Sequence, residues 1–236
     1  MVNVLSRSLC LTVSVLLVAC GQDAVTSSEQ TAEVSAESVS APLMPLQHEL
    51  VALPGLEDQV PQLNEKRTIS MQTDAGDLII EVYPQAAPNA AARFVELVNN
   101  GFYNETPVSR VVPGFVAQFG INWREGYKDW ADNNFDDDPT LFSLDRGTLA
   151  FAKAGPDTNS TQVFINYIEN NRLAAPQYNF TVFGKVVSGM EVVDSFLQVG
   201  DPGGGLDQGR LWEDGGNYLD SLPLKPTMIK SASVLE

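Results

Sequence analysis

Arg110 is the residue whose type and surroundings most strongly suggest chemistry. It lies in residues 106–120, TPVSRVVPGFVAQFG, where every other residue except Gln118 is apolar or small. A guanidinium group stays protonated in proteins, and burying a charge without a partner is very costly. Arg110 therefore indicates either an ordinary surface charge with a salt-bridge partner or a permanently charged hydrogen-bond donor held over an apolar site.

Two amide side chains accompany this arginine. A Pro-Gly turn should fold the chain that follows it back toward Arg110. Because side chains alternate along a strand, Val116 and Gln118 share one face there, and Gln162 and Phe164 share one face in the later segment GTLAFAKAGPDTNSTQVFIN. An apolar groove with a few placed polar groups is typical of a ligand pocket.

The composition excludes several kinds of catalysis. The chain has one histidine, His48, and two cysteines, Cys10 and Cys20, and all three precede the predicted domain. That domain therefore cannot hold a Ser-His-Asp triad, an HExxH zinc site, a histidine base or a cysteine nucleophile. We expect no metal and no cofactor.

Acidic residues dominate the charge balance. The net charge of −16 argues against a nucleic-acid partner, because phosphates require basic patches. Residues 132–138, DNNFDDD, resemble the start of a calcium loop, but Asp137 stands where glycine is needed and Ser143 where a bidentate glutamate belongs. We expect a solvated acidic loop there, and a second surface loop over Gly200–Asn217, whose glycines do not open a helix after a strand as a phosphate cradle would.

The N-terminus is typical of an exported protein. Residues 1–20, MVNVLSRSLCLTVSVLLVAC, combine one early positive charge with a short apolar stretch, as a secretory signal does. Their last four residues resemble a bacterial lipobox, which predicts a lipid on Cys20; the alternative is an ordinary signal peptide with a chance cysteine. Residues 21–64 begin rich in Ser, Ala, Glu and Thr and are expected to form a flexible tether. The folded domain is expected over 65–236.

Alternation of apolar and polar residues predicts mainly strands. Residues 68–72 and 77–82 alternate in this way, and residues 73–76 form a turn between them. Further short strands are expected near 108–112, 115–119, 148–152, 162–166, 181–187 and 227–234.

Only two helices are expected. Asn89 is predicted to cap the first, which begins at Pro88 and ends at Gly101. The second covers 190–197. Many short strands with few helices predict a mainly β fold, a closed antiparallel eight-stranded β-barrel capped by two α-helices.

Four long motifs resemble the cyclophilins, a family of peptidyl-prolyl cis-trans isomerases. They are APNAAARFVELVNNGFY, SRVVPGFVAQFG, LAFAKAGPDTNSTQVFIN and FTVFGKVVSGMEVVD, and they occur in the family's order between residues 67 and 236. The resemblance implies an isomerase of X-Pro peptide bonds that needs no cofactor. It would be a monomer that binds proline-containing polypeptides.

The resemblance also implies roles for individual residues. Arg110 would donate a hydrogen bond to the proline nitrogen, and Gln118 would orient Arg110 and the substrate backbone. Phe115 would belong to the catalytic set and to the pocket for the proline ring, with Val116, Phe164 and Leu173. Residues before the proline would lie along Ala152, Lys153 and Gln162, and Phe180 occupies a position where many members carry histidine.

Several positions depart from the family pattern. Lys153 replaces a usual asparagine, and Arg172 stands where cyclosporin-sensitive members have tryptophan, so we expect weak cyclosporin binding. Two functions remain open from the sequence. One is an isomerase that assists protein folding in the cell envelope, facing the periplasm and attached to the outer membrane if the host is Gram-negative. The other is a membrane-tethered module that binds proline segments with little turnover.

Overall fold

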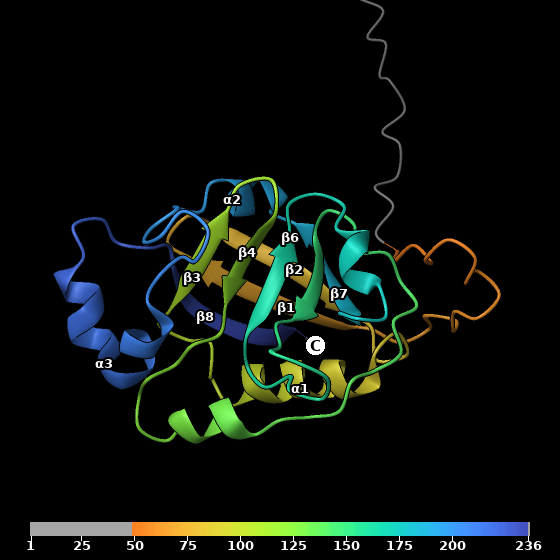
Figure 1. The fold of residues 1–236 in the computed structure, drawn as a ribbon, viewed down its shortest axis with the longest axis horizontal. Coiled ribbons are helices and arrows are strands. Elements are labelled where there is room, and N and C mark those ends of the chain that lie inside the picture. Colours follow the sequence, from red (N-terminus) through yellow and green to blue (C-terminus); the bar gives the residue numbers. More distant parts are fainter. Residues whose placement is uncertain (1–48, 236) are drawn as a thin grey trace, which may run out of the picture. The chain divides into compact units, whose positions relative to one another are not determined.

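The computed structural model describes residues 49–235 (Figure 1). The predicted signal peptide, the lipidation site Cys20, His48 and most of the expected tether lie outside the described residues. Among the residues that are described, no helix combines the length and the apolar character needed to cross a membrane.

The described residues form eight strands that close into one antiparallel barrel. Around the barrel the strands follow the order β1-β2-β7-β5-β6-β4-β3-β8. Closure leaves no strand edge unpaired, and the predicted eight-stranded barrel is confirmed. The strands are β1 (Arg67–Thr73), β2 (Asp77–Val82), β3 (Thr106–Val112), β4 (Val116–Phe119), β5 (Thr148–Phe151), β6 (Val163–Asn166), β7 (Val182–Ser188) and β8 (Met228–Leu235).

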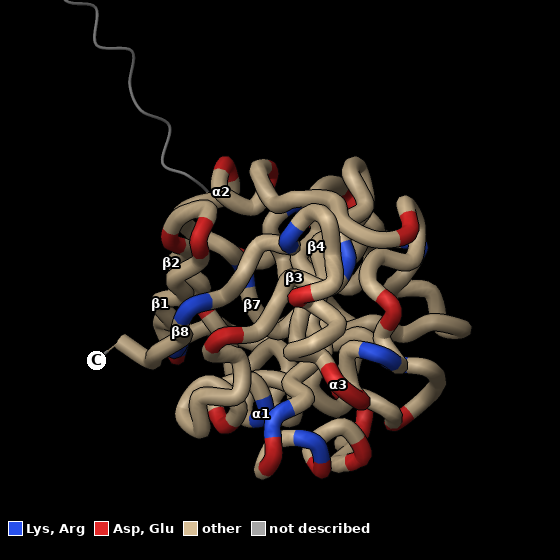
Figure 2. Tube along the Cα trace, turned by 90° about the vertical axis from the view of Figure 1, so that its left-hand side faces the viewer, with Lys and Arg blue, Asp and Glu red and all other residues tan. Residues whose placement is uncertain are grey.

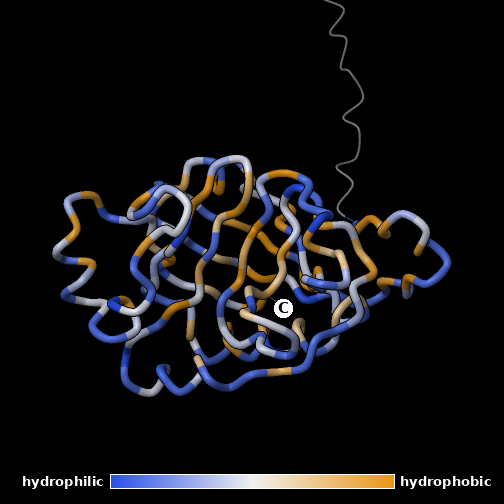
Figure 3. Tube along the Cα trace, viewed as in Figure 1, coloured by the Kyte–Doolittle hydropathy of each residue, from blue (hydrophilic) through white to orange (hydrophobic). Residues whose placement is uncertain are grey.

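The first hairpin shows how the sequence pattern builds the barrel wall. Ile69 pairs with Ile80, and Met71 pairs with Leu78, and all four side chains are buried. Alternate residues of a strand face the same side, so this register places the apolar residues of both strands in the core. Hydrophobic residues accordingly gather along the strands, while hydrophilic residues dominate the lower loops (Figure 3).

Helix α1 (Pro88–Asn99) lies against the barrel and contacts β7 and β8 (Figure 1). Its buried face includes Phe94, whose ring centroid lies 5.1 Å from that of Phe183 in β7. The prediction that Asn89 caps this helix is wrong. Ala87 is the N-cap and provides no side-chain hydrogen bond, and the cap is supplied from a distant loop.

Asp138 provides that cap. Its carboxylate accepts the backbone N–H groups of Asn89 at 3.1 Å and Ala90 at 2.9 Å, which satisfies two of the unpaired donors at a helix start. Burial raises the pKa of Asp138, although the two backbone hydrogen bonds act in the opposite direction. Asp138 is buried, so the prediction of a solvated acidic loop over 132–138 is wrong for this residue.

The segment after β7 contains two helices. Helix α2 (Met190–Asp194) is shorter than the predicted 190–197. Helix α3 (Gln208–Ser221) replaces most of the surface loop expected over Gly200–Asn217, and it is kinked at Asp214, whose backbone is not helical. The described residues therefore contain three α-helices rather than two, with short 3-10 helices at Lys128–Asp132 and Asn171–Ala174.

Capping and tertiary packing explain why α3 forms despite its glycines. Asp207 is the N-cap, and its side chain accepts the N–H of Arg210 at 3.0 Å. Gly215 lies against the Trp123 indole, where a Cβ would come within 2.3 Å of the ring. The buried residues of α3 join a separate apolar cluster that comprises Ile121, Val199, Leu206, Leu211, Tyr218 and Leu219.

Residues 49–64 contact the domain, although we expected them to end the tether. Leu53 N–H donates to the Leu141 carbonyl at 2.9 Å, and Ser143 N–H donates to the Val51 carbonyl at 2.7 Å. Leu50 is buried in the apolar cluster that also contains Phe164. Packing against the domain thus begins before residue 65.

Charged residues lie mainly on the loops and helix ends. In the view of Figure 2, basic residues are dispersed among acidic ones rather than gathered on one face. Acidic residues outnumber basic ones in the full chain, with 30 Asp and Glu against 14 Lys and Arg.

Candidate active site

The β3–β4 hairpin brings Arg110 and Gln118 together. A turn joins the strands, with Phe115 N–H donating to the Val112 carbonyl at 3.0 Å and Gly114 at φ +72°. In the resulting register Arg110 is paired with Gln118. The Arg110 Nη1 group donates to Gln118 Oε1 at 3.2 Å, as expected from a turn that folds the chain back.

Arg110 lines a pocket of about 390 Å³. Nine of the residues predicted for the site line it, and they come from strands β3, β4 and β6 and from the segments between strands. These are Arg110, Phe115, Val116, Gln118, Ala152, Lys153, Phe164, Leu173 and Phe180. A smaller pocket of about 220 Å³ shares Lys153 and Phe180 with it, but Arg110 and Gln118 do not line that pocket.

The apolar part of this pocket belongs to one packed cluster. Val116 and Phe164 are buried, while Phe115, Leu173 and Phe180 are partly buried against them. The rings of Phe164 and Phe180 meet edge to face, with centroids 5.6 Å apart and an interplanar angle of 78°. The cluster offers a shaped apolar surface beside a charged group, which suits a small ring with one polar atom.

Two guanidinium groups lie near the ring of Phe115. The Arg110 guanidinium carbon is 5.7 Å from the Phe115 ring centroid, and that of Arg172 is 5.0 Å away. Both distances allow attraction between the cation and the ring. Arg172 thus contacts the aromatic rim of the pocket at the position where the resemblance places tryptophan in other members.

A chain of amides continues from Arg110. Gln118 Nε2 donates to Gln162 Oε1 at 2.8 Å, and Gln162 Nε2 donates to Gln208 Oε1 at 3.2 Å. Gln162 is the one predicted site residue that does not line the pocket. It lies behind Gln118 and links the barrel to helix α3.

Three residues that the sequence did not predict complete the pocket: Gly203, Gly204 and Gln208. Gly203 contributes its backbone carbonyl, which accepts the Arg110 Nε–H at 2.7 Å. The sequence did contain a signal for the helix that carries Gln208. Asp207 is a good N-cap residue, and Leu211, Gly215, Tyr218 and Leu219 follow at helical spacing on a buried face.

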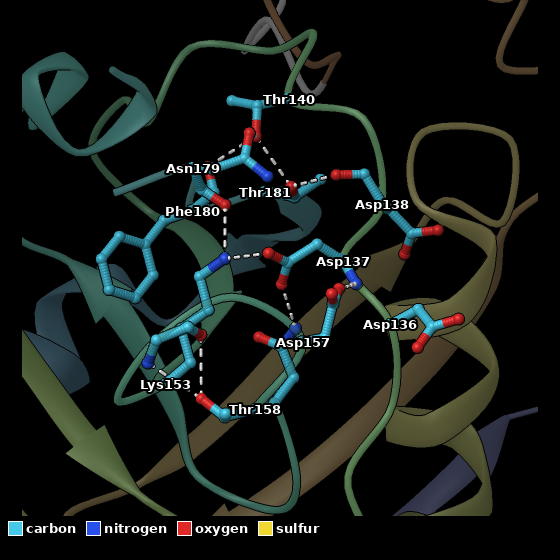
Figure 4. A network of polar contacts seen from close by, with 12 residues as sticks. Asp136, Asp137, Asp138, Thr140, Lys153, Asp157, Thr158, Asn179, Phe180 and Thr181 are labelled. Atoms are coloured by element: carbon cyan, nitrogen blue, oxygen red, sulfur yellow. Dashed lines mark hydrogen bonds and ion pairs between the residues drawn. The ribbon is translucent and has the colours of Figure 1, made fainter. Parts of the chain in front are cut away.

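Lys153 directs its ammonium group toward a polar network (Figure 4). Its Nζ donates to Asp137 Oδ2 at 2.5 Å and to the Asn179 carbonyl at 3.0 Å. The two charged side chains are only 4% and 14% exposed. Asp137 is therefore an ion-pair partner, and the prediction of a solvated loop is wrong for it as well.

The charge of Asp137 is well stabilised. Burial opposes ionisation, but hydrogen bonds from Lys153 and from Asn159 Nδ2, the latter at 2.6 Å, outweigh it and hold the pKa of Asp137 below its usual range. The network also fixes the backbone next to Phe180, since the Asn179 carbonyl is one of its acceptors. Lys153 lines the pocket, while its charge is satisfied by Asp137.

No group of three or more His, Cys, Asp or Glu side chains within residues 49–235 is arranged to hold a metal ion. Apart from Lys153, whose ammonium group is paired with Asp137, the side-chain donors among the lining residues are the guanidinium of Arg110 and the amides of Gln118 and Gln208. These groups can hydrogen-bond a peptide and stabilise a change in its charge distribution.

Comparison with known proteins identifies relatives of the whole domain. The family described as "Cyclophilin type peptidyl-prolyl cis-trans isomerase/CLD" matches residues 68–232. "Peptidyl-prolyl cis-trans isomerase A" of Dickeya dadantii is 36% identical over 174 residues, covering 71% of this chain and 84% of the relative. A peptidyl-prolyl cis-trans isomerase of Acinetobacter baylyi is 38% identical over 142 residues, covering 56% of this chain and 72% of the relative.

Solved structures agree on the fold. A cyclophilin-type isomerase of Cryptosporidium parvum superposes with a TM-score of 0.55 at 22% identity, covering 73% of this chain and 99% of the other. A structure of the same protein in the presence of the dipeptide Ala-Pro gives a TM-score of 0.53 at 23% identity, covering 72% of this chain and 99% of the other.

Proposed function

Because the chain belongs to the cyclophilin-type peptidyl-prolyl cis-trans isomerase family and is such an isomerase, we propose that Arg110 is its catalytic donor and that it assists protein folding in the cell envelope. The observation that carries the catalytic part is the position of Arg110. The guanidinium lines the same pocket as the apolar cluster and is held there by Gln118.

To catalyse rotation about a peptide bond, a protein needs only to stabilise the twisted peptide. The barrier of about 18–20 kcal/mol arises because the nitrogen shares its lone pair with the carbonyl, and an X-Pro bond exchanges slowly even though its two isomers are close in energy. No covalent bond breaks, so no nucleophile or base is needed. A donor placed against the proline nitrogen favours a pyramidal nitrogen and weakens the conjugation.

The pocket has the parts that this reaction needs. The apolar cluster holds the proline ring, and Arg110 provides a permanent charge that is already oriented before substrate binds. Within residues 49–235 the guanidinium hydrogen-bonds only to Gly203 and Gln118. It therefore keeps N–H donors for a substrate. A preorganised donor that interacts most strongly with the twisted peptide lowers the barrier rather than only binding the substrate.

The test is isomerisation of a short X-Pro peptide by the domain and by its Arg110→Ala variant. Removing the donor should lower kcat/KM by about 10²–10³, whereas Lys66→Ala, a charge change outside the pocket, should leave it unchanged. Unchanged turnover by Arg110→Ala would contradict the mechanism. Peptide binding without turnover by the unaltered domain would instead support the alternative of a tethered binding module.

The envelope location rests on residues 1–64, where a signal-like stretch ends at Cys20 and a Ser- and Ala-rich segment follows. In this proposal Cys20 carries lipid and the tether lets the domain search for exported chains near the membrane. Metabolic labelling with a radioactive fatty acid tests it: label should be incorporated into the full chain and be absent from Cys20→Ala. Equal labelling, or equal release of both proteins from membranes, would contradict the anchor.

A further inference from the structure

Residues 201–205, here called the glycine turn, form a self-supporting structure beside the pocket. The Asp201 carboxylate oxygen Oδ1 accepts the N–H groups of Gly203 at 2.9 Å and Gly204 at 2.6 Å. Asp201 and Gly205 also exchange two backbone hydrogen bonds, both 2.8 Å long. The two amides that bind the carboxylate lower the pKa of Asp201, so the turn is built around a charged acceptor.

The glycine turn lies directly on the backbone of β3 at Arg110. Leu206 N–H donates to the Ser109 carbonyl at 2.8 Å. A Cβ on Gly205 would lie 2.4 Å from that carbonyl oxygen and 2.7 Å from the Arg110 Cα, and Gly205 has φ +76°. Only glycine allows this approach, because any side chain would both clash and be strained.

This contact places a backbone acceptor on one side of the guanidinium. Gly203 O accepts the Arg110 Nε–H at 2.7 Å, while Gln118 Oε1 accepts from Nη1. Nε lies where the side chain joins the guanidinium and Nη1 lies at its far end. Two contacts at separate points of one planar group limit both its swing and its rotation, which a single contact would not.

Helix α3 holds the turn and reaches the same site through a side chain. Tyr218 Oη accepts the N–H of Asp207 at 2.9 Å, which ties the end of the loop to the buried face of the helix. Gln208, the first residue of α3, accepts a hydrogen bond from Gln162, which itself accepts from Gln118. Residues 201–221, which comprise the glycine turn and helix α3 and are here called the turn-helix segment, therefore reach Arg110 by two routes, one direct and one through amides.

We propose that the glycine turn and Gln208 are positioning elements for the catalytic arginine, with Asp201 as the side chain that keeps the Gly203 carbonyl in place. This inference rests on the proposed function, in which Arg110 is the donor to the proline nitrogen. The turn-helix segment determines how the donor is oriented, in addition to forming one wall of the pocket.

The experiment compares Asp201→Ala with Asp201→Asn and with Asp220→Ala, an exposed aspartate of α3 used as the matched charge control. Asp201→Ala removes the acceptor of two backbone amides, so kcat/KM should fall about tenfold, mainly through kcat. Asp201→Asn keeps an acceptor oxygen and should recover most of the activity. Asp220→Ala should match the unaltered protein.

Two further readouts separate positioning from a general loss of structure. Nitrogen-15 NMR should show a slowly exchanging Arg110 Nε–H signal that shifts or broadens in Asp201→Ala, with no change in the melting temperature comparable to that of a core variant. In an Arg110→Ala background, Asp201→Ala should cause no additional loss of the residual rate. Gln208→Ala, which leaves the turn intact, should give a smaller fall, of about threefold.

The outcomes distinguish this inference from the proposed function. An unaltered domain without isomerase activity would overturn the proposed function and the positioning role with it. An active domain in which Asp201→Ala leaves both kcat and the Nε–H signal unchanged would overturn only the positioning role. An equal loss in the Arg110→Ala background would also overturn it, because the turn would then act on the pocket and not through the arginine.

Discussion

The two walls beside Arg110 are built in different ways. On the barrel side, side chains from β4 and β6 are fixed by strand pairing, and Gln118 stands opposite Phe164 in the register. On the side of the turn-helix segment, the contact comes from the carbonyl of Gly203 in the glycine turn, which lies outside the barrel strands and is joined to β3 by the hydrogen bond from Leu206 N–H to the Ser109 carbonyl. The barrel wall is therefore held by many ladder hydrogen bonds and buried rings, whereas the wall formed by the turn-helix segment depends on a few local contacts.

This difference has a consequence for how each wall responds to change. A barrel residue belongs to the core as well as to the pocket, so altering it affects folding and catalysis together. The glycine turn adds little buried apolar area, and it should be possible to disturb it while the barrel remains folded. Substitutions on each wall test this contrast.

Phe164→Ala should have the largest effect. The ring is 4% exposed, packs edge to face on Phe180 and belongs to the apolar cluster of the pocket. Truncation should reduce the free energy of unfolding by about 3–5 kcal/mol and should abolish measurable turnover. Urea unfolding and peptide isomerisation measured on the same samples would show both losses. A variant that is inactive but as stable as the unaltered protein would contradict the expectation that residues of the barrel wall contribute to folding and catalysis together.

Asp137→Asn should cause the second-largest loss of stability, because it leaves the ammonium group of Lys153 buried without its counter-charge. The expected loss of unfolding free energy is about 3 kcal/mol at neutral pH. Asp137 has a lowered pKa in the folded state, so its charge stabilises the fold above the pKa of the unfolded chain. That contribution disappears as pH falls through the folded-state pKa.

Urea midpoints measured from pH 7 downward would check this sign. The unaltered protein should lose stability toward acid, and Asp137→Asn should lack that component. Parallel curves for the two proteins would show that the ion pair does not stabilise this wall.

Gly205→Ala should affect catalysis more than stability. The added Cβ would meet the Ser109 carbonyl, so the turn must move away from Arg110. We expect kcat/KM to fall about tenfold, while the melting temperature falls less than in Phe164→Ala. A loss of stability equal to that of Phe164→Ala would show that the two walls are not independent.

Arg172→Trp should have the smallest effect on turnover. Arg172 is exposed, and its guanidinium carbon lies 5.0 Å from the centroid of the Phe115 ring. A tryptophan there should strengthen cyclosporin binding, measured by calorimetry, while kcat/KM changes less than about threefold. Cyclosporin binding by the unaltered protein that is as tight as binding by Arg172→Trp would contradict our expectation that the unaltered protein binds cyclosporin weakly.

The sequence predicts the barrel wall well and the wall formed by the turn-helix segment poorly. The alternation of apolar and polar residues around Ile69 and Ile80 predicts the β1–β2 pair, and the Pro-Gly dipeptide before Phe115 predicts the turn between β3 and β4. The carbonyl of Gly203 does not, since every residue has one and only the tertiary structure decides where it points. Helix α3 was missed because its glycines favour loops, and packing against Trp123 overrides that preference.

The acidic segment shows the same limit. Asn89 has the right type to cap α1, yet the cap is Asp138, which lies 49 positions away from it in the sequence. Local patterns show that a helix begins near Pro88, and they cannot show which distant group satisfies its first N–H donors. The buried pair of Lys153 and Asp137 could likewise not be inferred from two segments that are separate in the sequence.

The amide chain behind Arg110 also has a polarity. A glutamine can present either its oxygen or its nitrogen to a neighbour, but a guanidinium has no acceptor. Arg110 therefore forces Gln118 to turn its oxygen inward, which orients Gln162 and then Gln208 in the same sense. The guanidinium of Arg110 thus determines the orientation of each amide as far as Gln208 at the start of α3. A glutamate at position 208 could still accept the hydrogen bond from Gln162, whereas a lysine there could only donate and would not fit this chain of hydrogen bonds.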